Sequence, residues 1–380
     1  MRPAARLAGL GGSPIRALSS GAPHDAVPLG LGEPTWEMPV VARQALARFE
    51  GVCSYGPQGG REELLRAIAA FHSADTKAPL EPARVLVTNG AQEALFAVTQ
   101  AYLGPGDSAL VPDPGFVGYP GVVRLAGARA VPYPLAANDR FRLDPDALIA
   151  VLERTPDARI VVIGHPSNPT GGGASQSALE RVAAACRARG VLLVSDEVYR
   201  ELYLGERPAS ILSVAEDALL LSSVSKGFGS PGLRVGWIVG SPALLAPIRV
   251  VHGYAVTCAS VPSQLAAAAM LEAAPPILDD ARRELALRFE ALAGAMRKEL
   301  GRAIEAPDGG FYHALPIPAE HRADPLAWCL RVRDEARVVL IPGLAFGEGG
   351  RSFARLSFAA RPEQLVEGVR RLAAFGLGAS

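Results

Sequence analysis

The chain has 380 residues, of which 49% are hydrophobic and 20% are charged, a composition typical of a folded globular protein. Lys and Arg together number 38, as do Asp and Glu, so the charge balance does not indicate a nucleic acid or an anionic membrane as partner. No apolar stretch reaches the ~18 residues that span a bilayer, and the length favours one large and one smaller domain.

Four cysteines are spread along the chain without close pairing: Cys53, Cys186, Cys258 and Cys329. Zinc sites and disulfide frameworks need cysteines at short, regular spacings, so neither is expected and no metal site is predicted. Unpaired cysteines favour a reducing compartment, and the start of the chain lacks the continuous apolar segment of a secretory signal. We therefore expect a cytoplasmic protein, with an organelle transit peptide as the less favoured alternative.

Seven short apolar segments predict β strands. Each is rich in Val, Leu and Ile and hardly alternates with polar residues, which is typical of strands covered on both faces. The segments are 84–88, 108–112, 128–133, 159–164, 191–195, 218–223 and 233–239. Helical patterns such as 91–102 and 177–190 separate them, so the sequence predicts an α/β fold with a mostly parallel seven-stranded sheet covered by helices.

Two prolines, Pro275 and Pro276, interrupt this alternation, and a long amphipathic helix follows at 277–300. We therefore expect a large domain of residues 40–270. A smaller α/β domain should consist of residues 1–39 and 271–380.

Small and polar residues follow directly after the predicted strands. They occur in TNGAQ (88–92), PDPGF (112–116), HPSNPTG (165–171), SDEVY (195–199) and SSVSK (222–226). Ligands of open α/β sheets bind beyond the carboxyl ends of the strands. The sequence therefore predicts a ligand site built from these segments.

One lysine, Lys226, ends an apolar run and has no charged neighbour before Arg234. A partly desolvated lysine has a lowered pKa and is suited to Schiff-base chemistry, whereas an ordinary surface lysine in a Gly/Ser loop is the alternative. The turn at Ala91 and Gln92 opens a helix whose free N–H groups favour a phosphate, which Ser223, Ser225 and Arg234 would complete. The alternative there is a common strand-to-helix turn.

Three further residues have both a functional and a structural interpretation. Asp196 follows a buried strand and is either the partner of a cationic ring nitrogen or a helix N-cap. Asn168 lies in NPTG and either donates to an oxygen of the ligand or serves the turn. Arg355 stands among apolar residues, where it binds a carboxylate of the ligand or forms an internal salt bridge. His165 is expected to pack or to cap rather than to act as a base.

Taken in order, these segments resemble the class I and II aminotransferases, the aspartate-aminotransferase type, which have fold type I of the pyridoxal-phosphate enzymes. The resemblance covers nearly the whole chain. Its most specific segments are SDEVY, NPTG and SVSKGFGSPGLRVG, and Asp196 precedes Lys226 by 30 residues, as is usual in the family.

The resemblance implies a role for each position around pyridoxal 5'-phosphate. Lys226 would form the Schiff base and move the proton, and Asp196 would keep the pyridine nitrogen protonated. Tyr199 and Asn168 would bind the phenolic oxygen, and Phe116 would cover the ring. The phosphate would be held by Ala91, Gln92, Ser223, Ser225 and Arg234.

The resemblance also implies that Arg355 binds the substrate α-carboxylate, with a backbone contact from Gly32. Tyr55 would reach the cofactor phosphate of a second subunit, so a homodimer with shared sites is expected. GGFYHAL places Phe311 and Tyr312 near the pocket or in the core. The arginines Arg124, Arg129 and Arg140 either approach a dicarboxylate or are solvated.

The expected activity is the transfer of an amino group between an L-amino acid and a 2-oxo acid through Lys226, with ping-pong kinetics. A β-eliminating lyase, or another amino-acid enzyme on the same scaffold, is the nearest alternative. A ligand-sensing regulator is less favoured, because the family-like part begins near residue 13 and leaves no room for a DNA-binding module.

Overall fold

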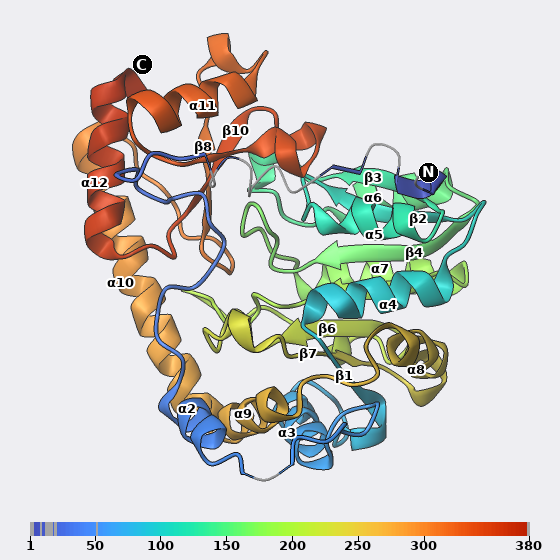
Figure 1. The fold of residues 1–380 in the computed structure, drawn as a ribbon. Helices are drawn as coiled ribbons and strands as arrows, with labels where there is room; N and C mark the ends of the chain where they lie inside the picture. Colours follow the sequence, from blue (N-terminus) through green and yellow to red (C-terminus); the bar gives the residue numbers. More distant parts are fainter. Residues whose placement is uncertain (1–3, 8–9, 12–17, 19–20, 51, 378–380) are drawn as a thin grey trace.

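The structure is a computed structural model that describes residues 4–7, 10–11, 18, 21–50 and 52–377 (Figure 1). Its central feature is a seven-stranded sheet with the order β1-β7-β6-β5-β4-β2-β3. The strands are β1 (Val85–Thr88), β2 (Ser108–Asp113), β3 (Arg129–Pro134), β4 (Ala158–Gly164), β5 (Leu192–Asp196), β6 (Leu219–Ser223) and β7 (Gly236–Val239). Only β7 runs antiparallel to its two neighbours in this sheet. The predicted mostly parallel, seven-stranded sheet is therefore confirmed.

Strand β7, the last strand of this sheet in chain order, is shorter than the predicted segment 233–239. Residues 231–233 form a 3-10 turn, and Arg234 has a left-handed backbone with φ 56°, so the strand begins only at Gly236. A left-handed residue cannot continue an extended strand. This bend brings the Arg234 side chain back to the carbonyl of Asn89, which lies between β1 and the next helix.

Helices cover both faces of the sheet. The helices are α2 (Val40–Ala47), α3 (Glu62–Ser73), α4 (Ala91–Tyr102), α5 (Gly118–Leu125), α6 (Pro145–Glu153), α7 (Gln176–Ala188), α8 (Pro242–Val256), α9 (Val261–Glu272), α10 (Ala274–Leu300), α11 (Pro325–Glu335) and α12 (Pro362–Leu372). Side chains from α4, α5 and α8 form one apolar cluster with the sheet, and side chains from α3, α6, α7 and α9 form another.

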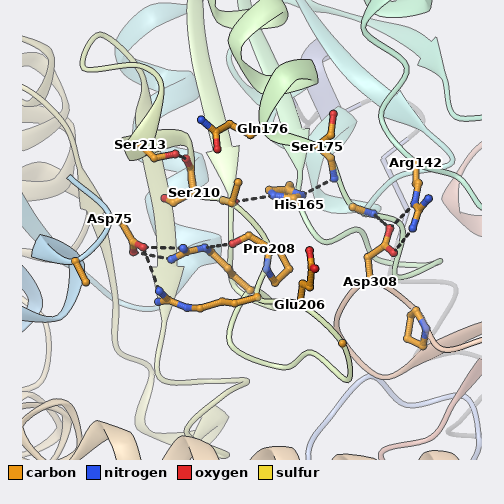
Figure 2. Close-up of a pocket in the computed structure, with 18 of the residues that line it drawn as sticks. Asp75, Arg142, His165, Ser175, Gln176, Glu206, Pro208, Ser210, Ser213 and Asp308 are labelled. Atoms are coloured by element: carbon orange, nitrogen blue, oxygen red, sulfur yellow. Dashed lines mark hydrogen bonds and ion pairs between the residues drawn. The ribbon is translucent and has the colours of Figure 1, made fainter. Parts of the chain in front are cut away.

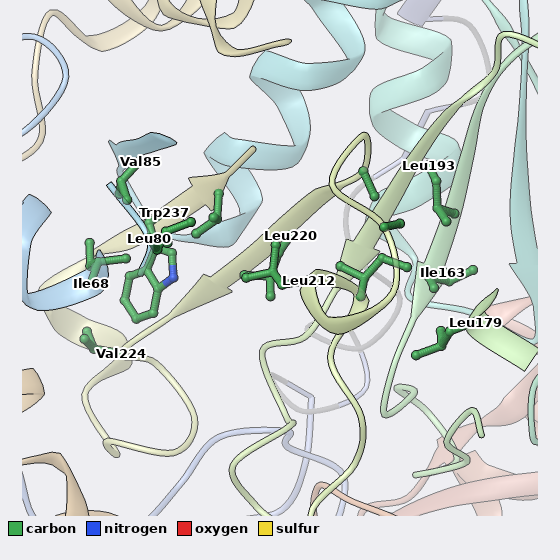
Figure 3. Close-up of a cluster of buried hydrophobic side chains, with 14 of the residues drawn as sticks. Ile68, Leu80, Val85, Ile163, Leu179, Leu193, Leu212, Leu220, Val224 and Trp237 are labelled. Carbon is green, nitrogen blue, oxygen red and sulfur yellow. The ribbon is translucent and has the colours of Figure 1, made fainter. Parts of the chain in front are cut away.

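Strand β6 shows why its sequence is apolar at consecutive positions. Leu219 and Leu221 belong to the cluster on the α4 face, whereas Leu220 belongs to the opposite cluster, which also contains Trp237 (Figure 3). Successive side chains of a strand point to opposite faces, so a strand covered on both sides needs apolar residues throughout.

The C-terminal elements form a third apolar cluster beside the sheet (left and top of Figure 1). They include a three-stranded antiparallel sheet, ordered β8-β10-β9, of Tyr312–Pro316, Phe353–Ser357 and Ile341–Pro342. Helix α10 begins at Ala274, so Pro275 and Pro276 lie inside its first turn rather than before it. Proline is tolerated there because the first N–H groups of a helix have no partner within the helix.

The segment around Val27 joins the N-terminal part of the chain to the second sheet. Val27 forms a bridge with Val338, and the N–H of Ser357 donates to the carbonyl of Leu29. In the same segment, the carbonyl of Gly32 accepts from Nζ of Lys226, which follows β6 of the first sheet. The division into residues 40–270 and residues 1–39 with 271–380 stays a prediction. Within the described residues, no helix combines the length and apolar character needed to cross a membrane.

Candidate active site

A cavity of about 350 Å³ lies where the carboxyl ends of β4, β5 and β6 face the second sheet. It brings together every residue to which the resemblance assigns a cofactor or substrate contact, except Tyr55. These lining residues are Gly32, Ala91, Gln92, Phe116, Asn168, Asp196, Tyr199, Ser223, Ser225, Lys226, Arg234 and Arg355. The position agrees with the general placement of ligands beyond the carboxyl ends of parallel strands.

Lys226 lies three residues beyond β6 and is partly buried in this cavity. Its Nζ donates to the carbonyl of Gly32 at 2.7 Å and lies 5.5 Å from the centre of the Tyr199 ring. Burial, with a contribution from the nearby Arg355 charge, lowers the pKa of Lys226 to about 8. A much larger share of its amine is therefore neutral near pH 7 to 8 than for an exposed lysine.

Asp196 ends β5 and is buried beneath the cavity. Burial raises the pKa of Asp196 to about 6, while a hydrogen bond from Tyr119 opposes that rise. The Tyr119 hydroxyl donates to Asp196 Oδ2 at 2.9 Å, and the N–H of Val198 contacts Oδ1 at 3.4 Å. The residues after Asp196 form a turn rather than a helix, so it is not a helix N-cap.

Tyr119 is a site residue that the sequence reasoning missed. It lies three residues after Phe116, and the two rings meet edge to face with centroids 5.5 Å apart. Tyr119 lies in the first turn of α5, whereas Phe116 precedes the helix, and the N–H of Tyr119 donates to the carbonyl of Phe116 at 3.0 Å. The sequence around Tyr119 carries no local signal for this role, because Tyr119 and Asp196 are 77 residues apart in the chain.

The opposite end of the cavity is suited to an anion. Helix α4 begins at Ala91 after Gly90, which has φ 81° and offers no side chain to cap the first N–H groups. A Cβ on Gly90 would lie 2.5 Å from Arg234 Nη2, so glycine permits the arginine to lie across the helix start. The hydroxyl-bearing Ser223 and Ser225 line the same end. Unpaired N–H groups, hydroxyls and a guanidinium form a site for a phosphate.

Arg355 lies in the central strand of the second sheet and is 1% exposed. Its Nη1 donates to Asn168 Oδ1 at 2.8 Å and its Nη2 to the carbonyl of Gly30 at 2.6 Å. Its Nε is buried without a hydrogen-bond partner, and no carboxylate pairs with it among the described residues. The guanidinium is thus held in place by neutral groups and retains N–H groups for a carboxylate, whereas the internal salt bridge is not formed.

Aromatic residues hold Arg355 between them. Its guanidinium lies 4.7 Å from the ring centres of both Tyr312 and Phe346. The Tyr312 hydroxyl is 2.7 Å from that of Tyr199, and Phe311 packs edge-on against Tyr199 with centroids 5.5 Å apart. Of the two residues predicted to lie near the pocket or in the core, Tyr312 lines the cavity and Phe311 is buried in the core.

Other predicted residues lie outside the cavity. Tyr55 is 87% exposed on this chain. Arg129 pairs with Asp157 and Arg140 with Asp308, and Arg124 is exposed; none of the three arginines lines the cavity.

His165 has the capping role that was expected. Its Nδ1 accepts from the N–H of Ala174 at 2.9 Å, and its Nε2 donates to the carbonyl of Ala209 at 2.8 Å. Burial lowers the pKa of His165 to about 4, which keeps the ring neutral near pH 7.

The donor set fits pyridoxal 5'-phosphate. The buried carboxylate of Asp196 can pair with a cation, and the start of α4 can bind an anion. Lys226, with its lowered pKa, lies in the same cavity. These features define an enzyme that binds a ring-shaped, phosphorylated cofactor through a lysine.

Comparison with known proteins leads to the same class. Residues 24–372 match the family model described as aminotransferase class I and II. The chain is 28% identical over 357 residues to an aspartate aminotransferase of Pyrococcus horikoshii, covering 92% of this chain and 90% of the relative. It is 32% identical over 351 residues to an arginine–pyruvate transaminase of Pseudomonas aeruginosa, covering 91% and 88% respectively.

Solved structures show the same fold. A mutant aspartate aminotransferase of Thermus thermophilus superposes with a TM-score of 0.90 at 28% identity, covering 98% of this chain and 100% of that one. An N-succinyldiaminopimelate aminotransferase of Mycobacterium tuberculosis also gives a TM-score of 0.90 at 30% identity, with 99% and 100% covered. The chain belongs to the class I and II aminotransferases of fold type I. It is a pyridoxal-phosphate-dependent transaminase, as the sequence predicted.

The lowered pKa of Lys226 predicts the pH dependence of cofactor capture. Only the neutral amine attacks an aldehyde, so the rate at which the apoenzyme binds pyridoxal 5'-phosphate should rise with pH and level off above a pKa of about 8. Stopped-flow absorbance between pH 7 and 10 measures this rate. Free Nα-acetyl-lysine is the control and should show no plateau in that range. A rate that also rises without a plateau in the enzyme would contradict the lowered pKa.

The hydrogen bond from Tyr119 predicts the effect of removing it. Tyr119→Phe should raise the pKa of Asp196 further, because the hydrogen bond opposes the effect of burial. Loss of a charge-assisted hydrogen bond of about 1.5 kcal/mol corresponds to a fall in kcat of about tenfold, and the acid limb of the kcat profile should move to higher pH.

Tyr133→Phe is the matched control, because Tyr133 is equally buried but donates to the carbonyl of Val162. A Tyr119→Phe profile that overlies the wild-type profile would refute the role.

Proposed function

We propose that Lys226 both carries the cofactor and moves the proton at the substrate α-carbon. Bound pyridoxal 5'-phosphate supplies an aldehyde that takes up the amino group and a ring that withdraws electrons from the α-carbon. The Nζ of Lys226 is half-neutral near pH 8, so it can act as nucleophile and, once displaced by the amino substrate, as general base. The position of Lys226 in the cavity, together with Asp196 and the start of α4, is the observation that carries this proposal.

The buried Asp196 would pair with the protonated ring nitrogen. A carboxylate without a cation at this depth is costly, so a cationic partner recovers the free energy that burial removes. Tyr119 supports the pairing, because its hydroxyl favours the ionised carboxylate over the neutral acid. Phe116 lines the cavity next to Tyr119 and would cover one face of the ring.

Tyr199 and Asn168 would bind the phenolic oxygen of the cofactor. The Oδ1 of Asn168 accepts from Arg355, which turns the amide nitrogen of Asn168 to donate elsewhere. Arg355 would in turn bind the substrate α-carboxylate with its remaining N–H groups, beside the backbone of Gly32. One chain of hydrogen bonds would thereby position both the cofactor and the substrate.

The phosphate would lie at the start of α4. The N–H groups of Ala91 and Gln92 have no partner in the first turn of that helix, and Ser223, Ser225 and Arg234 surround them. Arg234 keeps its left-handed backbone through the hydrogen bond from its Nη1 to the carbonyl of Pro231 at 2.8 Å. The strain of this non-glycine residue supports a positional role.

The substrates are an amino acid and a 2-oxo acid, and the two half-reactions should follow ping-pong kinetics. The relatives are named for amino-group transfer, which favours this reaction over β-elimination on the same scaffold. A cytoplasmic location stays a prediction.

The role of Lys226 has a direct test, because the chain has only two other lysines, Lys77 and Lys298. Borohydride treatment of the holoenzyme followed by peptide mass spectrometry should place a pyridoxyl group on Lys226 alone. Lys226→Ala should lose this group, the visible absorbance band and the formation of 2-oxo acid. Lys298→Ala, which changes a lysine whose side chain is 81% exposed, is the control and should behave as wild type. A pyridoxyl group on Lys77 or Lys298 instead would refute the proposal.

We also propose that two chains form a homodimer with shared sites. Tyr55 and Tyr254 are 87% and 93% exposed, and Gly253 contacts Gln58 in the segment that follows Tyr55. Exposed aromatic side chains that gather on one surface favour contact with another protein. In such a dimer, the Tyr55 hydroxyl would reach the cofactor phosphate of the partner.

Mixed dimers test the sharing of sites. Tyr55→Phe should weaken cofactor affinity about tenfold, the value of one charge-assisted hydrogen bond. When Tyr55→Phe and Lys226→Ala chains are mixed, one site of each hybrid dimer collects both defects and the other site is wild type. Titration of the mixture with cofactor should therefore recover wild-type affinity and activity in a fraction of the sites. No recovery would mean that Tyr55 does not act across the interface.

A further inference from the structure

A second cavity, of about 1060 Å³, lies on the other side of the loop that carries Asn168 (Figure 2). Pro166 and Asn168 line the candidate active site, whereas His165, Gly173 and Ala174 line the second cavity. The loop of residues 165–174 is therefore a wall shared by the two cavities. Whatever holds this loop from outside also sets the position of Asn168 inside.

The arginines that line the second cavity pair with carboxylates of the same chain. Arg200 and Arg207 pair with Asp75, and Arg142 pairs with Asp308. The arginines at this cavity thus have carboxylate partners within the chain, and the cavity does not resemble a site prepared for an anion. The pair of Arg142 and Asp308 differs from the others because it also binds the loop.

Two consecutive N–H groups of the loop are bound by side chains. The N–H of Gly173 donates to Asp308 Oδ2 at 2.9 Å, and the N–H of Ala174 donates to His165 Nδ1 at 2.9 Å. Arg142 holds the same carboxylate at both oxygens, with its Nε at 2.8 Å and its Nη2 at 2.7 Å. Asp308 therefore connects the loop to a distant arginine (Figure 2).

The close approach of these segments depends on glycine. A Cβ on Gly172 would lie 2.3 Å from the carbonyl oxygen of Phe141, and one on Gly173 would lie 3.0 Å from Cβ of Asp308. Arg140 and Phe141 have φ of 56° and 57°, which is strained for residues other than glycine. Strain of this kind persists where surrounding contacts fix the backbone, and it turns Arg140 and Arg142 toward Asp308.

Asp308 also lies close in sequence to Tyr312, an aromatic residue that lines the candidate active site. It precedes Tyr312 by four residues, and the N–H of the intervening Gly309 donates to the carbonyl of Gly171 at 3.2 Å. Asn168 and Tyr312 meet at Arg355, the first through a hydrogen bond and the second through its ring. Asp308 thus joins the two segments that hold Arg355.

We propose that Asp308 is a positioning residue that holds Asn168 and Tyr312 in their positions around Arg355. The carboxylate acts by accepting the N–H of Gly173 while Arg142 holds it in place. The consequence for catalysis rests on the proposed roles of Asn168 and Arg355. The consequence for the loop itself rests only on the contacts of Asp308.

Asp308→Ala and a matched control test the proposal. Asp217→Ala removes a carboxylate with the same two-point pairing, to Arg187 at 2.7 and 2.6 Å, but without a bond to the loop. Hydrogen–deuterium exchange of peptides covering residues 167–175 should become faster in Asp308→Ala and remain unchanged in Asp217→Ala. Asp308→Asn retains an oxygen that accepts from Gly173, so its exchange should stay close to wild type.

Two measurements on the holoenzyme test the effect on the site. The KM for the amino donor should rise about tenfold in Asp308→Ala, with a smaller change in kcat, because Arg355 loses its orientation. The midpoint of the pH titration of the cofactor's visible absorbance should move upward, because a displaced Asn168 no longer stabilises the phenolic oxygen as an anion. Asp308→Asn should restore both values toward wild type.

The results separately test the effect of Asp308 on the loop, its positioning role in the active site and the proposed function. If exchange in Asp308→Ala matches that in Asp217→Ala, the inference is overturned, whether or not the chain binds pyridoxal 5'-phosphate. If exchange accelerates while the KM and the absorbance midpoint stay at their wild-type values, the positioning role is overturned. A chain that takes up no cofactor refutes the proposed function and leaves the exchange result valid. Should Asp308→Ala fail to fold, Arg142→Gln removes the support of the carboxylate from the other side and is expected to accelerate the same exchange.

Discussion

The carboxylate of Asp196 lies at the end of a strand that is covered on both faces, where water does not solvate its charge. Burial raises its pKa, and the Tyr119 hydroxyl is the neutral donor that partly offsets this effect. An ionised group in such a place requires a cation, and the site provides room for one in a ligand. The rest of the site is arranged around that requirement, because the ring that satisfies it must also reach Lys226 and the start of α4.

The mostly parallel sheet makes this arrangement possible. Three neighbouring strands, β4, β5 and β6, end at the same edge, so the residues that follow them converge although they are far apart in the sequence. The second sheet closes the cavity from the other side with Arg355 and Tyr312. A buried arginine held by neutral oxygens and by two aromatic rings keeps its charge available without a competing carboxylate.

The parts of this structure that could be predicted from sequence are those with a local signal. Consecutive apolar residues mark β6 as a strand buried on both faces. The apolar segments also place Lys226, Asp196 and Asn168 after strands, and the resemblance assigns their roles. The missed features depend on contacts between distant segments. Tyr119 becomes informative only when α5 lies over the end of β5, and Asp308 only when the chain before β8 meets the glycines after Asn168. Element boundaries show the same limit at Arg234 and at the two prolines of α10. At each place the local sequence is compatible both with the predicted boundary and with the one in the structure.

The three glycines after Thr170 allow two other parts of the chain to approach the active-site wall from behind. No side chain separates their backbone from Pro307, Phe141 and Asp308, so a change in side-chain volume at those positions would press on the segment that follows Asn168. For enzyme engineering, substitutions at these outer positions would act on the active-site wall while every reacting group is left intact. Libraries restricted to the residues that touch substrate would miss these positions.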